Sequence, residues 1–200
     1  MKRLFLILIL FLSLLSVVKA DDIRDFEIEG MSVGNSLLNF FSEKKIKERV
    51  AITRSSYKKK DYIRVYFVLE NSKIYDVLNI HYKNDLKYEI ESIGGGIMNN
   101  YTFEECFEKQ QVIFNDLKKL FPKAEIEGDP KKKIIYRKDE TKKSVYSTVK
   151  YVIEGGYIDV RCTIFSSEYL KKHPTSGSSL QVIAHTRKFV DWLRNDPNKL

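Results

Sequence analysis

Two alternating segments on either side of Gly155 and Gly156 constrain the fold of this chain more than any other feature. Residues 145–153 and residues 158–164 each alternate between an apolar or small set and a second, more polar set. A period of two is typical of strands that bury one face. A pair of glycines between two such segments favours a two-residue hairpin turn. We therefore expect an antiparallel hairpin that turns at Gly155 and Gly156.

A second run of strands is expected earlier in the chain. Residues 62–69 alternate, with Ile63, Val65, Phe67 and Leu69 on one side and Tyr62, Arg64 and Tyr66 on the other. Residues 74–82 and 86–91 predict two further strands. Short polar loops separate these three segments. The glycine run at 94–96 then follows, and we interpret it as a flexible exit that ends this sheet segment.

The clearest helix begins after Thr102. Thr102 and Glu105 form a capping box, because the hydroxyl and the carboxylate can each satisfy a free backbone N–H. Apolar side chains then recur at helical spacing until Pro122 stops the helix. Near the C-terminus, we expect a strand over 180–185 and a helix capped by Thr186. One continuous helix over 179–195 is the alternative.

The order of these elements predicts the fold class. Ser36 and Ser42 are expected to cap two short helical segments near the beginning of the chain. The order is then helix, strands, helix, strands, helix, which favours an α+β fold over an alternating parallel one. We expect residues 21–200 to form a single domain, with antiparallel sheet packed against a central amphipathic helix and a C-terminal helix.

The first 20 residues have the three regions of a secretory signal peptide. Lys2 and Arg3 are followed by an apolar run over 4–18, and Ala20 ends the segment. We expect cleavage before Asp21, which leaves no integral membrane span and a secreted or periplasmic protein. The alternative is an uncleaved anchor, although the run of 15 residues is shorter than the roughly 20 that a spanning helix needs.

Two cysteines, Cys106 and Cys162, are the only ones in the chain. Cys106 lies on the apolar stripe of the central helix and Cys162 on the apolar face of a strand. Cysteines of exported proteins usually pair. We therefore predict a disulfide between them, and the alternative is two separately buried thiols.

No residue is assigned to a catalytic, cofactor or metal site. The three histidines, His81, His173 and His185, are expected to be half-buried strand or loop residues, since none has a neighbour at metal-ligand spacing. No nucleophile elbow or similar serine motif is present. The sequence therefore favours a non-catalytic role and predicts no cofactor.

The net charge of the chain indicates which kinds of partner to expect. The formal net charge is +8, and it falls to +5 when Lys2, Arg3 and Lys19 leave with the signal peptide. Such a charge weakly favours an envelope protein or an anionic surface as partner. An exported chain without an aromatic and basic motif is not expected to bind nucleic acid.

Residues 28–38 (IEGMSVGNSLL) form the most motif-like stretch. Together with residues 102–107, where a cysteine lies early in the central helix, this stretch resembles a group of small exported bacterial proteins that has no assigned activity. The resemblance implies export and carries over no functional residue. We expect an exported, non-catalytic binding or envelope-accessory protein, and an exported hydrolase with an unrecognised site is the alternative.

Overall fold

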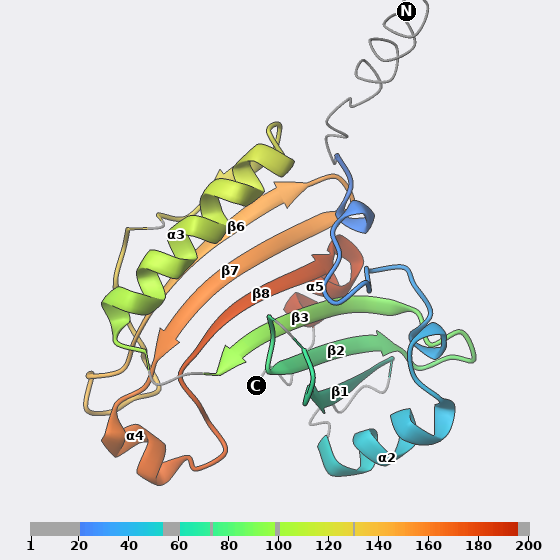
Figure 1. Ribbon diagram of the computed structural model, residues 1–200, viewed down its shortest axis with the longest axis horizontal. Helices are drawn as coiled ribbons and strands as arrows, with labels where there is room; N and C mark the ends of the chain where they lie inside the picture. The colour runs from blue at the N-terminus through green and yellow to red at the C-terminus, as the bar shows by residue number, and fades with distance from the viewer. Residues whose placement is uncertain (1–20, 54–60, 73, 99–100, 130, 196–200) are drawn as a thin grey trace, which may run out of the picture.

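The protein is built around one antiparallel sheet of eight strands (Figure 1). The computed structural model describes residues 21–53, 61–72, 74–98, 101–129 and 131–195. The strands run in the order β1-β2-β3-β8-β7-β6-β4, and β5 also pairs with β6. Their bounds are β1 (Tyr62–Val68), β2 (Val77–Lys83), β3 (Ile90–Met98), β4 (Glu125–Glu127), β5 (Ile134–Ile135), β6 (Val145–Ile153), β7 (Gly156–Ile164) and β8 (Ser179–Thr186).

Helices pack against both faces of the sheet. They are α2 (Glu43–Thr53), α3 (Phe103–Leu120), α4 (Ser167–Lys172) and α5 (Arg187–Asn195), with single 3-10 turns η1 (Ile23–Asp25) and η2 (Leu37–Asn39). The expected α+β fold, with a central and a C-terminal helix beside antiparallel sheet, is therefore confirmed. The expected strand followed by a helix is also correct near the C-terminus, where β8 leads into α5.

The expected caps explain where three of these helices and turns begin. Thr102 Oγ1 accepts from the backbone N–H of Glu105 at 3.2 Å, and the Glu105 carboxylate accepts from Thr102 N at 2.9 Å. Thr186 Oγ1 accepts from Phe189 N at 3.1 Å at the start of α5. The hydroxyl of Ser36 accepts from the backbone of the η2 turn.

Two three-stranded meanders make up most of the sheet. The β1-β2-β3 meander and the β6-β7-β8 meander meet where β3 pairs antiparallel with β8. Because side chains alternate along a strand, directly paired residues share a face. Cys162 and Leu180 are paired and lie on one face, whereas Arg161 and Gln181 are paired and lie on the other. We call the first the α3 face and the second the α5 face.

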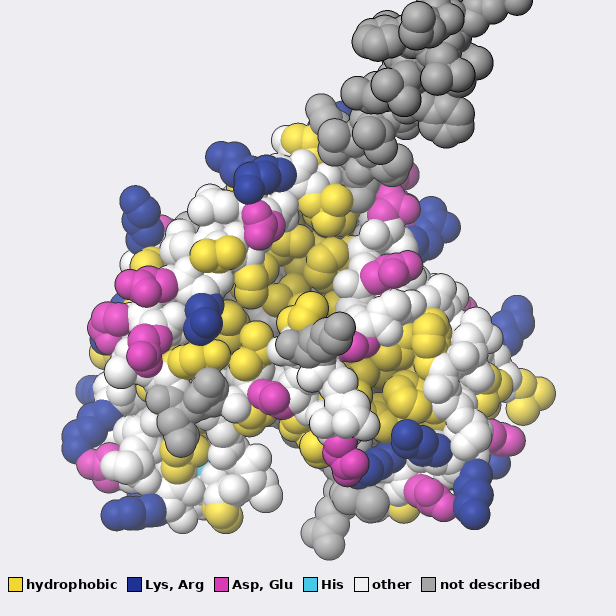
Figure 2. Space-filling view, in the orientation of Figure 1, with side chains coloured by type: hydrophobic (Ala, Val, Ile, Leu, Met, Phe, Trp, Pro, Cys, Tyr) yellow, Lys and Arg dark blue, Asp and Glu magenta, His cyan; other side chains and the backbone are white. Residues whose placement is uncertain are grey.

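The hydrophobic core lies on the α3 face. Helix α3 packs across β6, β7 and β8, and the segment from η1 to η2 crosses the other part of this face (Figure 1). Buried apolar side chains from both coverings meet those of the strands, among them Ile23, Leu37, Val65, Ile80, Ile93, Val160 and Val182. Figure 2 shows apolar side chains between α3 and the N-terminal segment, with charged side chains around the rim.

Gln110 and the disulfide tie α3 to the sheet. Cys106 and Cys162 form the predicted bond, with Cα atoms 5.9 Å apart and both residues fully buried. One turn further along α3, Gln110 Nε2 donates to the backbone oxygens of Ser147 and Val160 at 3.2 and 2.9 Å. Cysteine and glutamine therefore fix the same helix face to β6 and β7.

The predicted turn of the β6–β7 hairpin is wrong by one residue. Ile153 pairs with Gly156, so the turn consists of Glu154 and Gly155. Gly155 has a φ of +77°, which suits glycine. Gly156 is needed for another reason: a Cβ there would lie 2.1 Å from the carbonyl oxygen of His185, where β8 passes close by.

The interpretation of the glycine run at 94–96 as an exit is also wrong. These glycines lie in the middle of β3, which continues to Met98 and pairs with both β2 and β8 along the run. The expected strand at 86–91 correspondingly begins later, at Ile90, and Leu86 is 93 % exposed. Partners on both sides hold the glycines in a strand that local preference disfavours.

The predicted signal peptide, residues 1–20, lies outside the described residues. None of the helices that the structure describes is long and apolar enough to cross a membrane.

Candidate ligand-binding site

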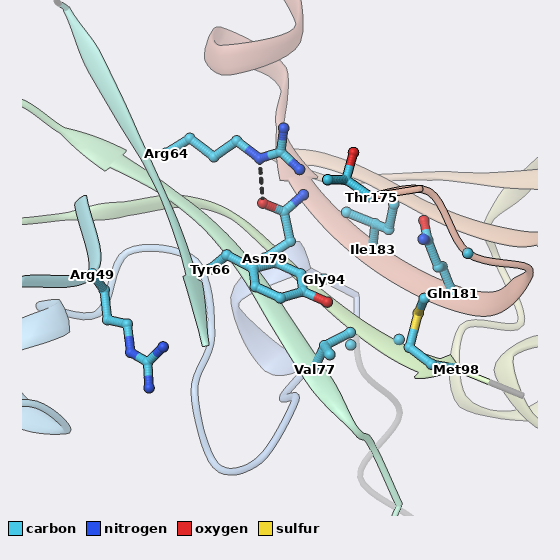
Figure 3. A pocket seen from close by; sticks show the side chains of 13 residues that line it. Arg49, Arg64, Tyr66, Val77, Asn79, Gly94, Met98, Thr175, Gln181 and Ile183 are labelled. Carbon is cyan, nitrogen blue, oxygen red and sulfur yellow. Dashed lines mark hydrogen bonds between the residues drawn. The ribbon is translucent and has the colours of Figure 1, made fainter. Parts of the chain in front are cut away.

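The α5 face is polar and only partly covered. Helix α5 lies over one end of the central strands, where Phe189 is fully buried. Beside it, the same face holds an open pocket of about 540 Å³. The described residues that line it are Arg49, Arg64, Tyr66, Val77, Asn79, Gly94, Gly95, Gly96, Met98, Thr175, Gly177, Gln181 and Ile183 (Figure 3).

The glycine run forms the floor of this pocket. Gly94 and Gly96 belong to the α5 face, where neighbouring side chains lean over the bare backbone. A Cβ on Gly94 would lie 3.1 Å from Ile183 of β8, and a Cβ on Gly96 would lie 2.8 Å from Val77 of β2. Without side chains at these two positions, the floor stays at backbone level while β1, β2 and β8 supply the walls.

Arg64 and Asn79 form a hydrogen-bonded pair in the pocket. Arg64 Nε donates to Asn79 Oδ1 at 2.8 Å, from β1 to β2. Both side chains are half-buried. In the part of the chain that the structure describes, Arg64 takes part in no ion pair. The guanidinium group is thus oriented by a neutral amide and not neutralised by a carboxylate.

The charged side chains among the described residues that line the pocket are all basic. Arg49 and Arg64 line it, and none of the described lining residues is acidic. Burial raises the pKa of Tyr66, an effect that Arg64 opposes and Asp76 reinforces. Asp76 lies outside the lining, and its Oδ2 accepts a hydrogen bond from the backbone N–H of Met98 at 2.7 Å.

Beneath α5, two of the histidines come together. His81 of β2 and His185 of β8 are each paired with Ser92 of β3, one on either side. Phe189 packs against both rings, with centroid distances of 4.8 and 6.0 Å. Burial lowers the pKa of His81 to about 3 and that of His185 to about 4, so both rings are neutral near pH 7.

The row formed by His81, Ser92 and His185 also lies beside an acid, Asp159. The sequence did not predict this combination of serine, histidine and acid. His185 Nε2 lies 3.5 Å from Asp159 Oδ2. Burial raises the pKa of Asp159. However, Ser92 is only 1 % exposed, and its hydroxyl makes no hydrogen bond among the described residues. A substrate cannot reach Ser92 beneath Phe189, so the row supports the packing of α5 and does not provide a nucleophile.

Two other polar groups are structural. His173 is the C-cap of α4, and its ring packs at a tilt against that of Tyr169, with the centroids 4.2 Å apart. Burial of Asp139 opposes its ionisation, but hydrogen bonds from Ser144, Thr141 and Ser166 outweigh that effect and lower the pKa of its carboxyl. These bonds link the loop before β6 to the start of α4. Within the described ranges, no three His, Cys, Asp or Glu side chains are placed to hold a metal ion.

The sequence contained part of the signal for this site. The alternation over β1 placed Arg64 on the face opposite Ile63 and Val65, but it did not show that the glycine run would lie on the same face as Arg64. No protein-family model, curated protein or solved structure matches this chain. The geometry of the pocket is therefore the main guide to function.

Proposed function

We propose that this protein is an exported, non-catalytic binding protein and that a small molecule occupies the pocket on the α5 face. The observation that carries the proposal is the pocket itself, at about 540 Å³ and lined by both apolar and polar side chains. Small-molecule sites in proteins have volumes of roughly 300–1,000 Å³ and combine an apolar lining with a few oriented polar groups. Arg64 and Asn79 are such a group.

The composition of the pocket favours binding over hydrolysis. The described lining residues include no serine, cysteine, histidine, aspartate or glutamate. Hydrolysis needs a nucleophile or an activated water together with a base. The serine and histidine that do lie close together, Ser92 and His185, are beneath α5 and outside the pocket.

The proposed compartment is the periplasm or the extracellular space. The Cys106–Cys162 disulfide supports it, since such bonds persist in oxidising compartments. The segment over residues 1–20 provides the export signal that this compartment requires. Membership of the small exported bacterial proteins that residues 28–38 resemble would agree with this proposal.

A thermal-shift screen of the mature protein tests the proposal. A library of neutral, cationic and anionic small molecules is compared on the wild type and on Ile183→Trp, which fills the pocket from β8. Ligand that binds only the folded state raises its stability. We expect at least one compound to raise the midpoint of the wild type and not that of the variant.

Thr175→Trp provides a second pocket-filling variant, because Thr175 is exposed at the rim and its replacement leaves the sheet untouched. Circular dichroism confirms that each variant is folded. The proposal is wrong if no compound stabilises the wild type, or if every stabilising compound acts equally on a folded pocket-filled variant. Turnover of an ester, glycoside, phosphate or peptide substrate that both pocket-filling variants abolish would favour the hydrolase instead.

A further inference from the structure

We infer that the ligand of this pocket carries a carboxylate, which binds to Arg64 and Asn79. This inference rests on the proposed function, because it names the class of molecule that the same pocket holds. Its basis is the arrangement of donors on the two side chains, the lack of a competing acid in the described lining, and the apolar walls nearby.

The first step is the direction of the free donors. The Nε–H of Arg64 is already used, since it donates to Asn79 Oδ1 at 2.8 Å. The two terminal nitrogens of the guanidinium remain, and they form a planar fork that matches the two oxygens of a carboxylate. Because Asn79 accepts through Oδ1, its amide nitrogen keeps two hydrogens to donate. Figure 3 draws that nitrogen and a terminal nitrogen of Arg64 on the side of Thr175 and Ile183.

The second step is charge. A half-buried guanidinium is partly removed from water, and an anionic partner compensates for that loss. Arg64 has no such partner among the described residues, because the group that accepts the hydrogen bond from its Nε–H is the neutral amide of Asn79. A cationic ligand would meet Arg49 and Arg64 in the lining, whereas an anionic ligand meets no described acidic side chain there.

The third step separates a carboxylate from a phosphate. Phosphate sites usually combine several cations with free backbone N–H groups at a helix N-terminus or in a loop. Here the floor is the backbone of β3, which is paired with β2 on one side and with β8 on the other. Its N–H groups therefore serve the sheet, and the side-chain fork of Arg64 is the main anion-binding element.

The fourth step concerns the body of the ligand. Val77, Met98 and Ile183 contribute apolar surface to the walls, and the ring of Tyr66 adds a flat one. A carboxylate on a compact apolar or aromatic body can therefore place its charge on Arg64 while its body lies over the glycine floor. Highly hydrated anions such as citrate have no apolar body that could pack against these walls.

Matched probes test this inference. Octanoate, phenylacetate and 2-naphthoate are each compared with the neutral amide of the same body, and phenylacetate also with phenyl phosphate. Affinities for the mature protein are measured by isothermal titration calorimetry at constant ionic strength. We expect at least one carboxylate to bind about ten- to a hundred-fold more tightly than its amide, the range of one charge-assisted pair.

Two variants locate the effect. Arg64→Gln is expected to remove the preference for the carboxylate, whereas Arg64→Lys keeps the charge but not the fork and retains part of it. Arg161→Gln is the matched control, because Arg161 is an exposed arginine on the same face that does not line the pocket. It removes the same charge and is expected to change the affinity less than about three-fold, as a screened surface charge would.

The inference is overturned if no carboxylate binds more tightly than its own amide, if phenyl phosphate binds more tightly than phenylacetate, or if Arg161→Gln weakens binding as much as Arg64→Gln does. It is also overturned if none of the probes binds while the wider screen still finds compounds that Ile183→Trp excludes. In that last case the proposed function stands and only the ligand class is wrong. A screen without any pocket-dependent compound removes both.

Discussion

Removing the Cys106–Cys162 bond is expected to reveal how much of the stability depends on fixing α3 to the sheet. The bond joins residues 56 positions apart and connects the first turn of α3 to the C-terminal part of β7. Both cysteines are 0 % exposed. The perturbation is the double variant Cys106→Ala/Cys162→Ala, because alanine leaves no unpaired hydroxyl in the core as serine would.

The magnitude follows from the length of the closed loop. For a separation of 56 residues, the chain-entropy model gives about 4 kcal/mol of stabilisation at 25 °C. Replacing two buried sulfur atoms also opens two small cavities, each of which costs about 1 kcal/mol. The double variant should therefore lose about 4–6 kcal/mol. In a domain of this length, a loss of 4 kcal/mol lowers the melting midpoint by about 8–16 °C.

Equilibrium urea denaturation of the mature protein measures this loss. The control is wild-type protein that has been unfolded and refolded in reductant, which keeps the sulfur atoms and lacks only the bond. We expect the reduced wild type to lose about 4 kcal/mol and the double variant to lose the same or more. The reasoning is refuted if the double variant stays within about 1 kcal/mol of the oxidised wild type.

Three further predictions concern the N-terminus, the buried histidines and the glycine run. Intact-mass analysis of exported protein should find residues 1–20 removed, and a retained N-terminal methionine would contradict this. Unfolded histidine takes up a proton near pH 6.5, whereas burial lowers the folded pKa of His81 to about 3 and of His185 to about 4. The free energy of unfolding should therefore be highest above about pH 6.5 and fall by about 2 kcal/mol per histidine from pH 7.5 to pH 5. In urea titrations at these pH values, the variant His81→Phe should lose half as much free energy of unfolding as the wild type. An equal loss in the variant and the wild type would refute this prediction. Gly95→Ala should cost about 1–3 kcal/mol, because its Cβ would lie 2.5 Å from the ring of Tyr75, and an unchanged urea midpoint would show that the ring moves freely.

Elements with local signals were predictable from the sequence. Thr102 and Glu105 define the start of α3 through contacts only three residues apart, and an apolar stripe defines its length. The alternation over β1, β6 and β7 is equally local. Helix α4, by contrast, is only six residues long and is stabilised by the Ser166 cap. Such a short helix leaves too little periodicity to be recognised.

The pocket and the approach of His81 to His185 could not be predicted, because both depend on register. Gly94 is paired with Asn79 and with Ile183, residues that are 15 and 89 positions away in the chain. His81, Ser92 and His185 form a row only because β3 lies between β2 and β8. A sequence pattern shows which face of a strand is polar, but it does not show which polar faces will be adjacent.

The two faces of the sheet have different roles, which explains why a binding site can exist on this fold. The α3 face holds the disulfide and most of the buried apolar side chains, so the stability of the domain depends mainly on that side. The open part of the α5 face holds half-buried polar side chains such as Arg64 and Asn79, which contribute little to the core. Substituting these two residues should therefore change ligand affinity far more than stability, whereas substitutions on the α3 face should do the reverse. Because of this separation, a loss of ligand affinity in an Arg64 variant can be attributed to the binding site and not to a loss of folding stability.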